Sequence, residues 1–139
     1  MIEQISPIGF ILAIIASMAI GAVWYTALSQ PWIKANGFNA KQISQIEAGG
    51  GAGVYGIAAL CHAVMAVVLS FVLYHTQTLS LAGGLVTGLV CWIGFVVTTM
   101  SVNHRFQMKP WSLTIIDAGH YLLILLAQGA LIGWFSSAS

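Results

Sequence analysis

Charged side chains are scarce in this sequence. Its 139 residues include four Lys or Arg and three Asp or Glu, which amount to 5% of the chain, whereas 59% of the residues are hydrophobic. Soluble globular domains carry about 25% charged residues, and so few charges could not cover a surface that faces water. We therefore expect lipid to be the main solvent of this chain.

The sequence also lacks the motifs of several functional classes. A net charge of +1 argues against nucleic acid as a partner, because phosphate binding needs clustered Lys and Arg. Cys61 and Cys91 lie in apolar segments without the spacing of a disulfide framework or a zinc finger. Phosphate-binding glycine loops, nucleophile elbows and HExxH motifs are absent as well. We therefore assign no catalytic residue and no metal ligand, and the sequence identifies no cofactor.

What the sequence does contain is four long apolar stretches. A helix needs about 20 mainly apolar residues to cross a bilayer, and we expect such spans at about residues 5–28, 53–74, 81–101 and 111–135. In lipid the backbone must satisfy its own hydrogen bonds, which favours helices. The predicted fold is therefore all-α: an integral membrane four-helix bundle that forms a single transmembrane domain over residues 1–139.

The connection between the first two spans contains the start of a further helix. Asn39 can cap a helix, and Gln42 can reach back to the capping residue from the third helical position. Ile43 and Ile46 then share one face of that helix. These residues predict a short amphipathic helix at about residues 40–48, lying on the inner membrane surface. Such a helix either covers the end of the bundle or acts as a lid.

All the basic residues lie in two connections between the spans. Lys34 and Lys41 lie between spans one and two, and Arg105 and Lys109 lie between spans three and four. Cytoplasmic loops of membrane proteins carry an excess of Lys and Arg. We therefore expect both connections to face the cytoplasm and both chain termini to lie outside.

Small residues are spaced for close contact between helices. Gly-x-x-x-Gly pairs begin at Gly84 in span three and at Gly129 in span four, and Gly53 and Gly56 begin a comparable strip in span two. Lipid provides no hydrophobic drive between helices, so small residues that let backbones approach must provide the contact. Because four helices bury few side chains in one subunit, we also expect a homo-oligomer, most simply a dimer.

Asp117 is the most informative polar residue, because it lies inside an apolar span. It stands about six positions after the start of span four, or roughly 9 Å deep at 1.5 Å per residue. A buried carboxylate is costly unless it is paired, and ionisable groups inside membranes are candidates for function. One interpretation makes Asp117 part of a functional site. The other pairs it with Arg105 or Lys109, which would pin the third connection against the bundle.

Two histidines are expected at a similar depth. His120 follows Asp117 at the i+3 position, on the same helix face, and His62 lies about nine residues into span two. If these faces converge, the three side chains form a polar cluster open toward the cytoplasm. Such a cluster could relay protons or ligate a metal. Hydrogen-bonded packing histidines would explain the same residues.

Aromatic and polar residues near the same layer complete the candidate site. Trp24 and Tyr25 end span one, and Asn103 follows the end of span three. Trp and Tyr are common at membrane interfaces, but aromatic walls with a few convergent polar groups are also typical of small-molecule sites. The predicted ligand-binding residues are therefore Asp117, His120, His62, Trp24, Tyr25 and Asn103, whereas His75 and His104 are expected to face solvent.

Several short segments together resemble a known family. They are Gly21-Ala22-Val23-Trp24-Tyr25, Pro31-Trp32-Ile33-Lys34, Asn36-Gly37-Phe38, Pro110-Trp111, Ile116-Asp117-Ala118-Gly119-His120-Tyr121 and Gly129-Ala130-Leu131-Ile132. With these segments the sequence is similar to the small bacterial membrane proteins called domain of unknown function 1761. The resemblance implies four spans and a bacterial inner membrane. It implies no activity, cofactor or catalytic residue.

Three functional hypotheses follow from these features. The first is a homo-oligomeric protein that binds or translocates a small or amphipathic molecule at the polar site facing the cytoplasm. The second is an accessory or scaffolding subunit of a larger membrane complex, in which the polar residues only pin helices together. The third is a membrane-embedded enzyme that could depend on a metal.

Overall fold

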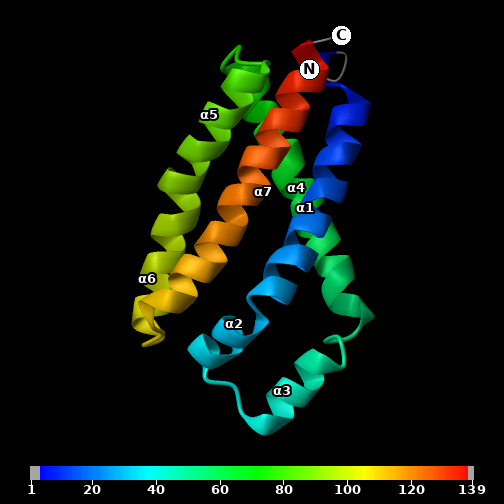
Figure 1. Ribbon diagram of the computed structural model, residues 1–139. Helices are drawn as coiled ribbons and strands as arrows, with labels where there is room; N and C mark the ends of the chain where they lie inside the picture. Colours follow the sequence, from blue (N-terminus) through cyan, green and yellow to red (C-terminus); the bar gives the residue numbers. More distant parts are fainter. Residues whose placement is uncertain (1–3, 138–139) are drawn as a thin grey trace.

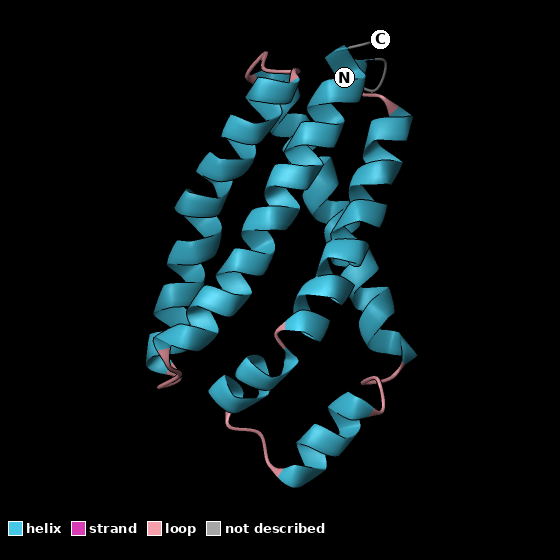
Figure 2. Cartoon of the chain, in the orientation of Figure 1, coloured by secondary structure: helices cyan, strands magenta, loops and turns pink. Residues whose placement is uncertain are grey.

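The computed structural model describes residues 4–137, and within this range it contains helices and turns but no strand (Figure 2). The long helices run side by side as rods, and the short helices lie at one end of them (Figure 1). The long rods are α1 (Pro7–Ala27), α4 (Ala52–His75), the continuous α5 (Leu81–Cys91), η2 (Trp92–Val97) and α6 (Thr98–Phe106), and α7 (Trp111–Ser137). The short helices are α2 (Ser29–Asn36) and α3 (Ala40–Glu47).

The all-α prediction is confirmed, because four helices are long and apolar enough to cross a membrane. They are Pro7–Ala27, Ala52–His75, Leu81–Phe106 and Trp111–Ser136. The first, second and fourth of these agree closely with the predicted spans. The third extends past its predicted end at residue 101.

The longer third helix has a local explanation. Asn103, His104 and Arg105 lower the hydropathy of this segment, but polar side chains do not interrupt backbone hydrogen bonding. The helix ends at Phe106, shortly before Met108 adopts a φ of 55°. Six residues of this helix, the segment η2, are π-helical, so that each of its turns holds one residue more than an α-helical turn.

The connection between α1 and α4 is largely helical. The predicted amphipathic helix is α3, and the reciprocal bonds of Asn39 and Gln42 at its start each measure 2.9 Å. The helix α2 was not predicted; it ends at Gly37, whose φ of 70° suits glycine. Gly49, Gly50 and Gly51, all at positive φ, then connect α3 to α4.

The helix α7 packs against α5, α1 and α4 and is the most buried of the four spans. Its contact with α5 depends on glycine, as predicted. A Cβ added to Gly84 would overlap the backbone of Gly129, and one added to Gly133 would overlap the backbone of Ser80. The strip in α4 does not serve this purpose in the subunit, because no atom lies within 4 Å of a Cβ added to Gly53 or Gly56.

The outward faces of the helices are apolar. Large exposed side chains include Ile57 on α4, Val90 on α5, Phe95 in η2 and Ile115 on α7, each at least half exposed. A soluble monomer rarely carries apolar patches on this scale. These faces therefore indicate a lipid bilayer around the helices.

The two ends of the bundle differ in charge. The helices α2 and α3 and the turn between α6 and α7 lie at the same end, and the chain termini lie at the other (Figure 1). Lys109 Nζ donates to the carbonyl of Asn36 at 2.7 Å, which joins the two connections. All four Lys and Arg residues are thus at one end of the described chain, which we call the cationic end.

Candidate functional site

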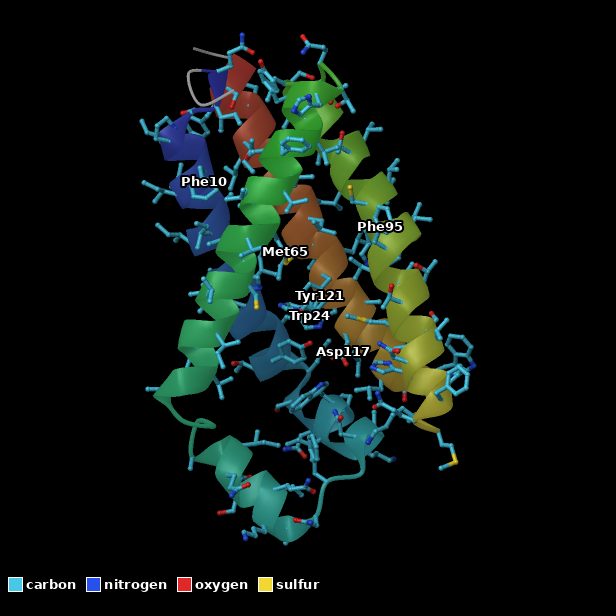
Figure 3. The ribbon with its side chains drawn as sticks, turned by 180° about the vertical axis from the view of Figure 1, so that it is seen from behind. Phe10, Trp24, Met65, Phe95, Asp117 and Tyr121 are labelled. Carbon is cyan, nitrogen blue, oxygen red and sulfur yellow. The ribbon has the colours of Figure 1, made fainter. Side chains whose placement is uncertain are left out.

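The carboxylate of Asp117 lies where α1, α2 and α7 meet. Its Oδ1 accepts a hydrogen bond of 2.8 Å from the hydroxyl of Tyr25 and one of 3.1 Å from Nε1 of Trp32. The Asp117 side chain is 18% exposed. Donors to an ionised acceptor make the stronger class of hydrogen bonds, so these two contacts hold α1 and α2 against α7. Figure 3 shows Asp117 close to Trp24 and Tyr121, between the helices and toward the end that carries α2 and α3.

The second carboxylate oxygen of Asp117 faces α6. His104 Nε2 lies 3.9 Å from Oδ2, which is within ion-pair range if the ring is protonated. His104 Nδ1 lies 2.9 Å from the hydroxyl of Thr114, to which Arg105 Nη2 also donates at 2.8 Å. Either His104 Nδ1 or the Thr114 hydroxyl can be the donor of this bond, because the hydroxyl has a second lone pair as well as a proton.

Neither of the predicted pairs of Asp117 with Arg105 or Lys109 occurs. The guanidinium of Arg105 lies over the ring of Trp111, 3.8 Å from its centroid, and Lys109 binds the backbone of α2. Sequence reasoning placed both cations on the correct side and at plausible reach. It could not give the rotation of α6 about its axis, which directs His104 rather than Arg105 toward the carboxylate.

The histidines His120 and His62 lie one layer further from the cationic end. The His120 ring is 4.8 Å, centroid to centroid, from both Tyr25 and Tyr121, and 6.5 Å from His62. His120 is 5% exposed and His62 is 6% exposed. Across residues 4–137, no hydrogen-bond partner reaches either ring nitrogen of His120 or Nδ1 of His62. The three predicted side chains therefore lie near one another but are linked indirectly. Tyr25 contacts the His120 ring with its own ring and donates a hydrogen bond to Asp117.

Tryptophans from two helices fix the part of α7 that carries Asp117. Trp24 Nε1 donates to the carbonyl of Ile116 at 3.0 Å, and Trp92 Nε1 donates to that of Ala118 at 2.7 Å. These carbonyls flank Asp117 in the chain. Gly119 leaves room for the Trp24 ring, because a Cβ there would lie 3.0 Å from it. Trp24, predicted as a wall of the site, thus also fixes the position of α7.

A groove adjoins this cluster at the cationic end. It is an open groove of about 570 Å³ between α2, α3 and the glycine connection that precedes α4. Its lining consists of Trp32, Phe38, Gln42, Gln45, Ile46, Ala48, Gly50 and Gly51. Trp32 belongs to both places, since it lines the groove and donates to Asp117. We call this space the interfacial groove.

Asn103 is not part of this arrangement. It is exposed and lines a separate shallow depression of about 310 Å³ with Thr98, Thr99 and Val102. The neighbouring residue His104 is the one directed toward α7, and adjacent helical residues lie about 100° apart around the axis.

Two contributors were missed by the sequence reading. Trp32 was not among the predicted ligand-binding residues, and His104 was expected to face solvent. A partial signal existed for His104: it and Thr114 lie at similar distances from the short turn between two antiparallel helices, so they lie at the same depth. For Trp32 no comparable signal existed, because α2 itself was not predicted.

Metal-ligating residues do not gather at this site. Within residues 4–137, no group of three or more His, Cys, Asp and Glu side chains is placed to hold a metal ion. Cys61 and Cys91 are free thiols. The chemistry present is that of one carboxylate, several hydrogen-bond donors and a set of aromatic rings.

Long apolar helices, a lipid-compatible surface and a polar site at one end define the class: an α-helical membrane bundle with four spans. The model of the family described as Protein of unknown function (DUF1761) matches residues 8–133. The chain belongs to this family, as the resemblance in the sequence predicted. No significant match was found among curated proteins or among solved structures.

Proposed function

We propose that the chain binds a small amphipathic molecule in the interfacial groove and passes it along the bundle. One observation carries this proposal: Trp32 lines the groove while its Nε1 donates to the partly buried carboxylate of Asp117. An apolar part of a ligand can contact the groove wall, and a polar part can reach the Asp117 cluster.

The size and lining of the groove support this proposal. Sites for small molecules enclose about 300–1,000 Å³ and combine aromatic or aliphatic walls with a few polar groups. The groove has such walls in Trp32, Phe38 and Ile46, and the amides of Gln42 and Gln45 as polar groups. Its lining also includes Gly50 and Gly51, which have no side chain to cover their backbone.

The charge distribution supports a cytoplasmic position for this site. We propose that the cationic end faces the cytoplasm of a bacterium and that the protein spans the inner membrane with both termini outside, following the positive-inside rule. We also propose a homodimer, because only 11% of the third span is buried within the subunit. A second copy would cover part of that surface.

Photolabelling tests the groove directly. The probe is a neutral long-chain alcohol that carries a diazirine, applied to membrane vesicles that contain the protein and mapped by mass spectrometry of peptides. We expect labels to concentrate between residues 32 and 51. The variant Ala48→Trp fills the groove and should lose this labelling, whereas the matched variant Ser44→Trp adds the same side chain on α3 outside the groove lining and should keep it.

Two results would contradict the proposal. Labels spread evenly over outward positions such as Val67, and unchanged by Ala48→Trp, would show that the probe reports lipid exposure alone. A stoichiometric protein partner that co-purifies and blocks labelling of the groove would favour an accessory subunit of a larger complex instead.

A further inference from the structure

We infer that the molecule bound at this site is a lipophilic organic monocation, such as an amine or a quaternary onium ion. This inference rests on the proposed function and names the chemical class of its ligand. It follows from the charge of Asp117, from the partners that this carboxylate lacks, and from the aromatic rings between it and the groove.

The negative charge of Asp117 has no Lys or Arg partner in the described chain. Arg105 and Lys109, the nearest cations in sequence, are bound to Thr114 and Asn36. Lys34 and Lys41 are exposed on α2 and α3. His104 at 3.9 Å is the one titratable base in ion-pair range of the carboxylate among residues 4–137. A carboxylate that is partly removed from water is costly without a cation beside it. A cationic ligand therefore gains binding free energy from its attraction to Asp117, whereas a neutral ligand does not.

The carboxylate also has acceptor capacity left. Its Oδ1 is used by Tyr25 and Trp32, whereas no hydrogen-bond donor reaches Oδ2 within the described residues, since His104 Nε2 is beyond hydrogen-bond distance at 3.9 Å. A carboxylate offers about four lone-pair positions. Asp117 therefore keeps negative charge and acceptor capacity that the bonds holding α1 and α2 do not use.

A chain of aromatic contacts leads from the groove to this carboxylate. The ring centroids of Phe38 and Trp32 are 5.4 Å apart, those of Trp32 and Tyr25 are 5.4 Å apart, and those of Tyr25 and His120 are 4.8 Å apart. The first two pairs are edge-to-face, so each contact covers one face of only one of its two rings. Aromatic faces are negative and attract organic cations within about 6 Å.

Trp32 couples the two kinds of attraction. Donation of its Nε1–H to a carboxylate draws electron density toward the indole ring, because hydrogen-bonded groups polarise one another. A cation against this ring therefore meets a richer π face and, beyond the N–H edge of the ring, the charge of Asp117. None of the groove-lining residues carries a formal charge. The preference for a cationic over a neutral ligand therefore depends on Trp32 and Asp117.

Three probes of similar size test the inference on detergent-solubilised protein by equilibrium dialysis. They are the cation tetraphenylphosphonium, the anion tetraphenylborate and the neutral triphenylphosphine oxide. We expect the cation to bind at least tenfold more tightly than the neutral probe. Asp117→Asn should weaken cation binding at least tenfold and leave neutral binding within about twofold. The matched control Glu47→Gln removes an exposed carboxylate at the same end and should change neither.

A second pair of variants keeps the test informative if Asp117→Asn does not fold. Trp32→Phe retains an aromatic ring but loses the donor to Asp117, and Trp32→Leu loses both. We expect cation affinity to fall from wild type to Trp32→Phe and again to Trp32→Leu, with a smaller change for the neutral probe. An equal loss for both probes would indicate packing alone and would overturn the inference.

The outcomes separate the two proposals. Equal binding of all three probes would show that charge is not selected, which overturns the cation inference while the groove remains a binding site. No saturable binding of any probe, together with no photolabelling of residues 32–51, would overturn both.

Discussion

The two ends of this bundle are held together in opposite ways. Near the chain termini, α5 and α7 touch through backbone, where Gly84 faces Gly129 and Gly133 faces Ser80. At the cationic end, α7 is held by side-chain hydrogen bonds from Tyr25, Trp24 and other residues of the surrounding helices. The first contact depends on the shape of the helices and the second on polar chemistry.

This difference indicates where function can change without loss of the fold. A contact made by shape tolerates no added volume, because protein interiors are close-packed. A contact made by hydrogen bonds tolerates conservative changes of volume but not the loss of a partner. Substitutions at the two ends should therefore fail for different reasons.

The largest expected effect is at the glycine contact. Gly84→Leu forces the side chain into the backbone of α7, which lies too near for any rotamer to avoid it. We expect a loss of at least about 3 kcal/mol of stability, the upper end of overpacking effects, or no folded protein. Unfolding in mixed micelles of increasing denaturing-detergent content measures this. Gly56→Leu, where a Cβ meets no atom, is the control, and similar losses in both variants would contradict the contrast.

Asp117→Asn should separate function from folding. The amide keeps an acceptor oxygen for Tyr25 and Trp32, so we expect a loss of stability of about 1–2 kcal/mol. In proteoliposomes, flux of tetraphenylphosphonium should fall at least tenfold. Unchanged flux in a stable variant would remove Asp117 from the functional site.

Tyr25→Phe sharpens the polar side of the comparison. The variant keeps the ring that contacts Trp32 and His120 but loses the bond of 2.8 Å to the carboxylate. A hydrogen bond to a charged group contributes about 1.5–3 kcal/mol, and we expect a loss in that range from the same micelle titration. Tyr55→Phe, at an exposed position of α4, should have no measurable effect.

The smallest expected effect lies outside the bundle. Asn39→Ala removes the reciprocal cap of α3, which should cost about 1 kcal/mol of local helix stability. Hydrogen exchange should become roughly fivefold faster in residues 40–47 and stay unchanged in α7. Ser44→Ala, within the same helix, is the control. Faster exchange in α7 as well would mean that α3 stabilises the whole bundle.

The fold was predictable from the sequence because the hydropathy of a segment indicates whether lipid or water surrounds it. This indication does not depend on which other segments the segment packs against. Depth was predictable too: the constant rise per residue placed Asp117, His120 and His62 in neighbouring layers. Rotation about each helix axis was not, since tertiary packing decides it. This is why the sequence favoured Arg105 over His104 as a neighbour of Asp117 and included Asn103. The helix α2, with Trp32, lay outside the prediction because Leu28 at its start makes no side-chain cap, whereas α3, of the same length, begins with the Asn39–Gln42 capping box.

The π-helical segment η2 has a consequence for how variation in this family can be interpreted. One additional residue in a wide turn delays the following helix by about 100°, so α6 is out of phase with α5 although the two form one rod. An insertion or deletion between Trp92 and Val97 would therefore rotate α6 about the helix axis. His104 and its neighbours would then point in a different direction, while the rod changed little in length. Homologues that differ by a single residue there would share the same scaffold and present a different face to Asp117.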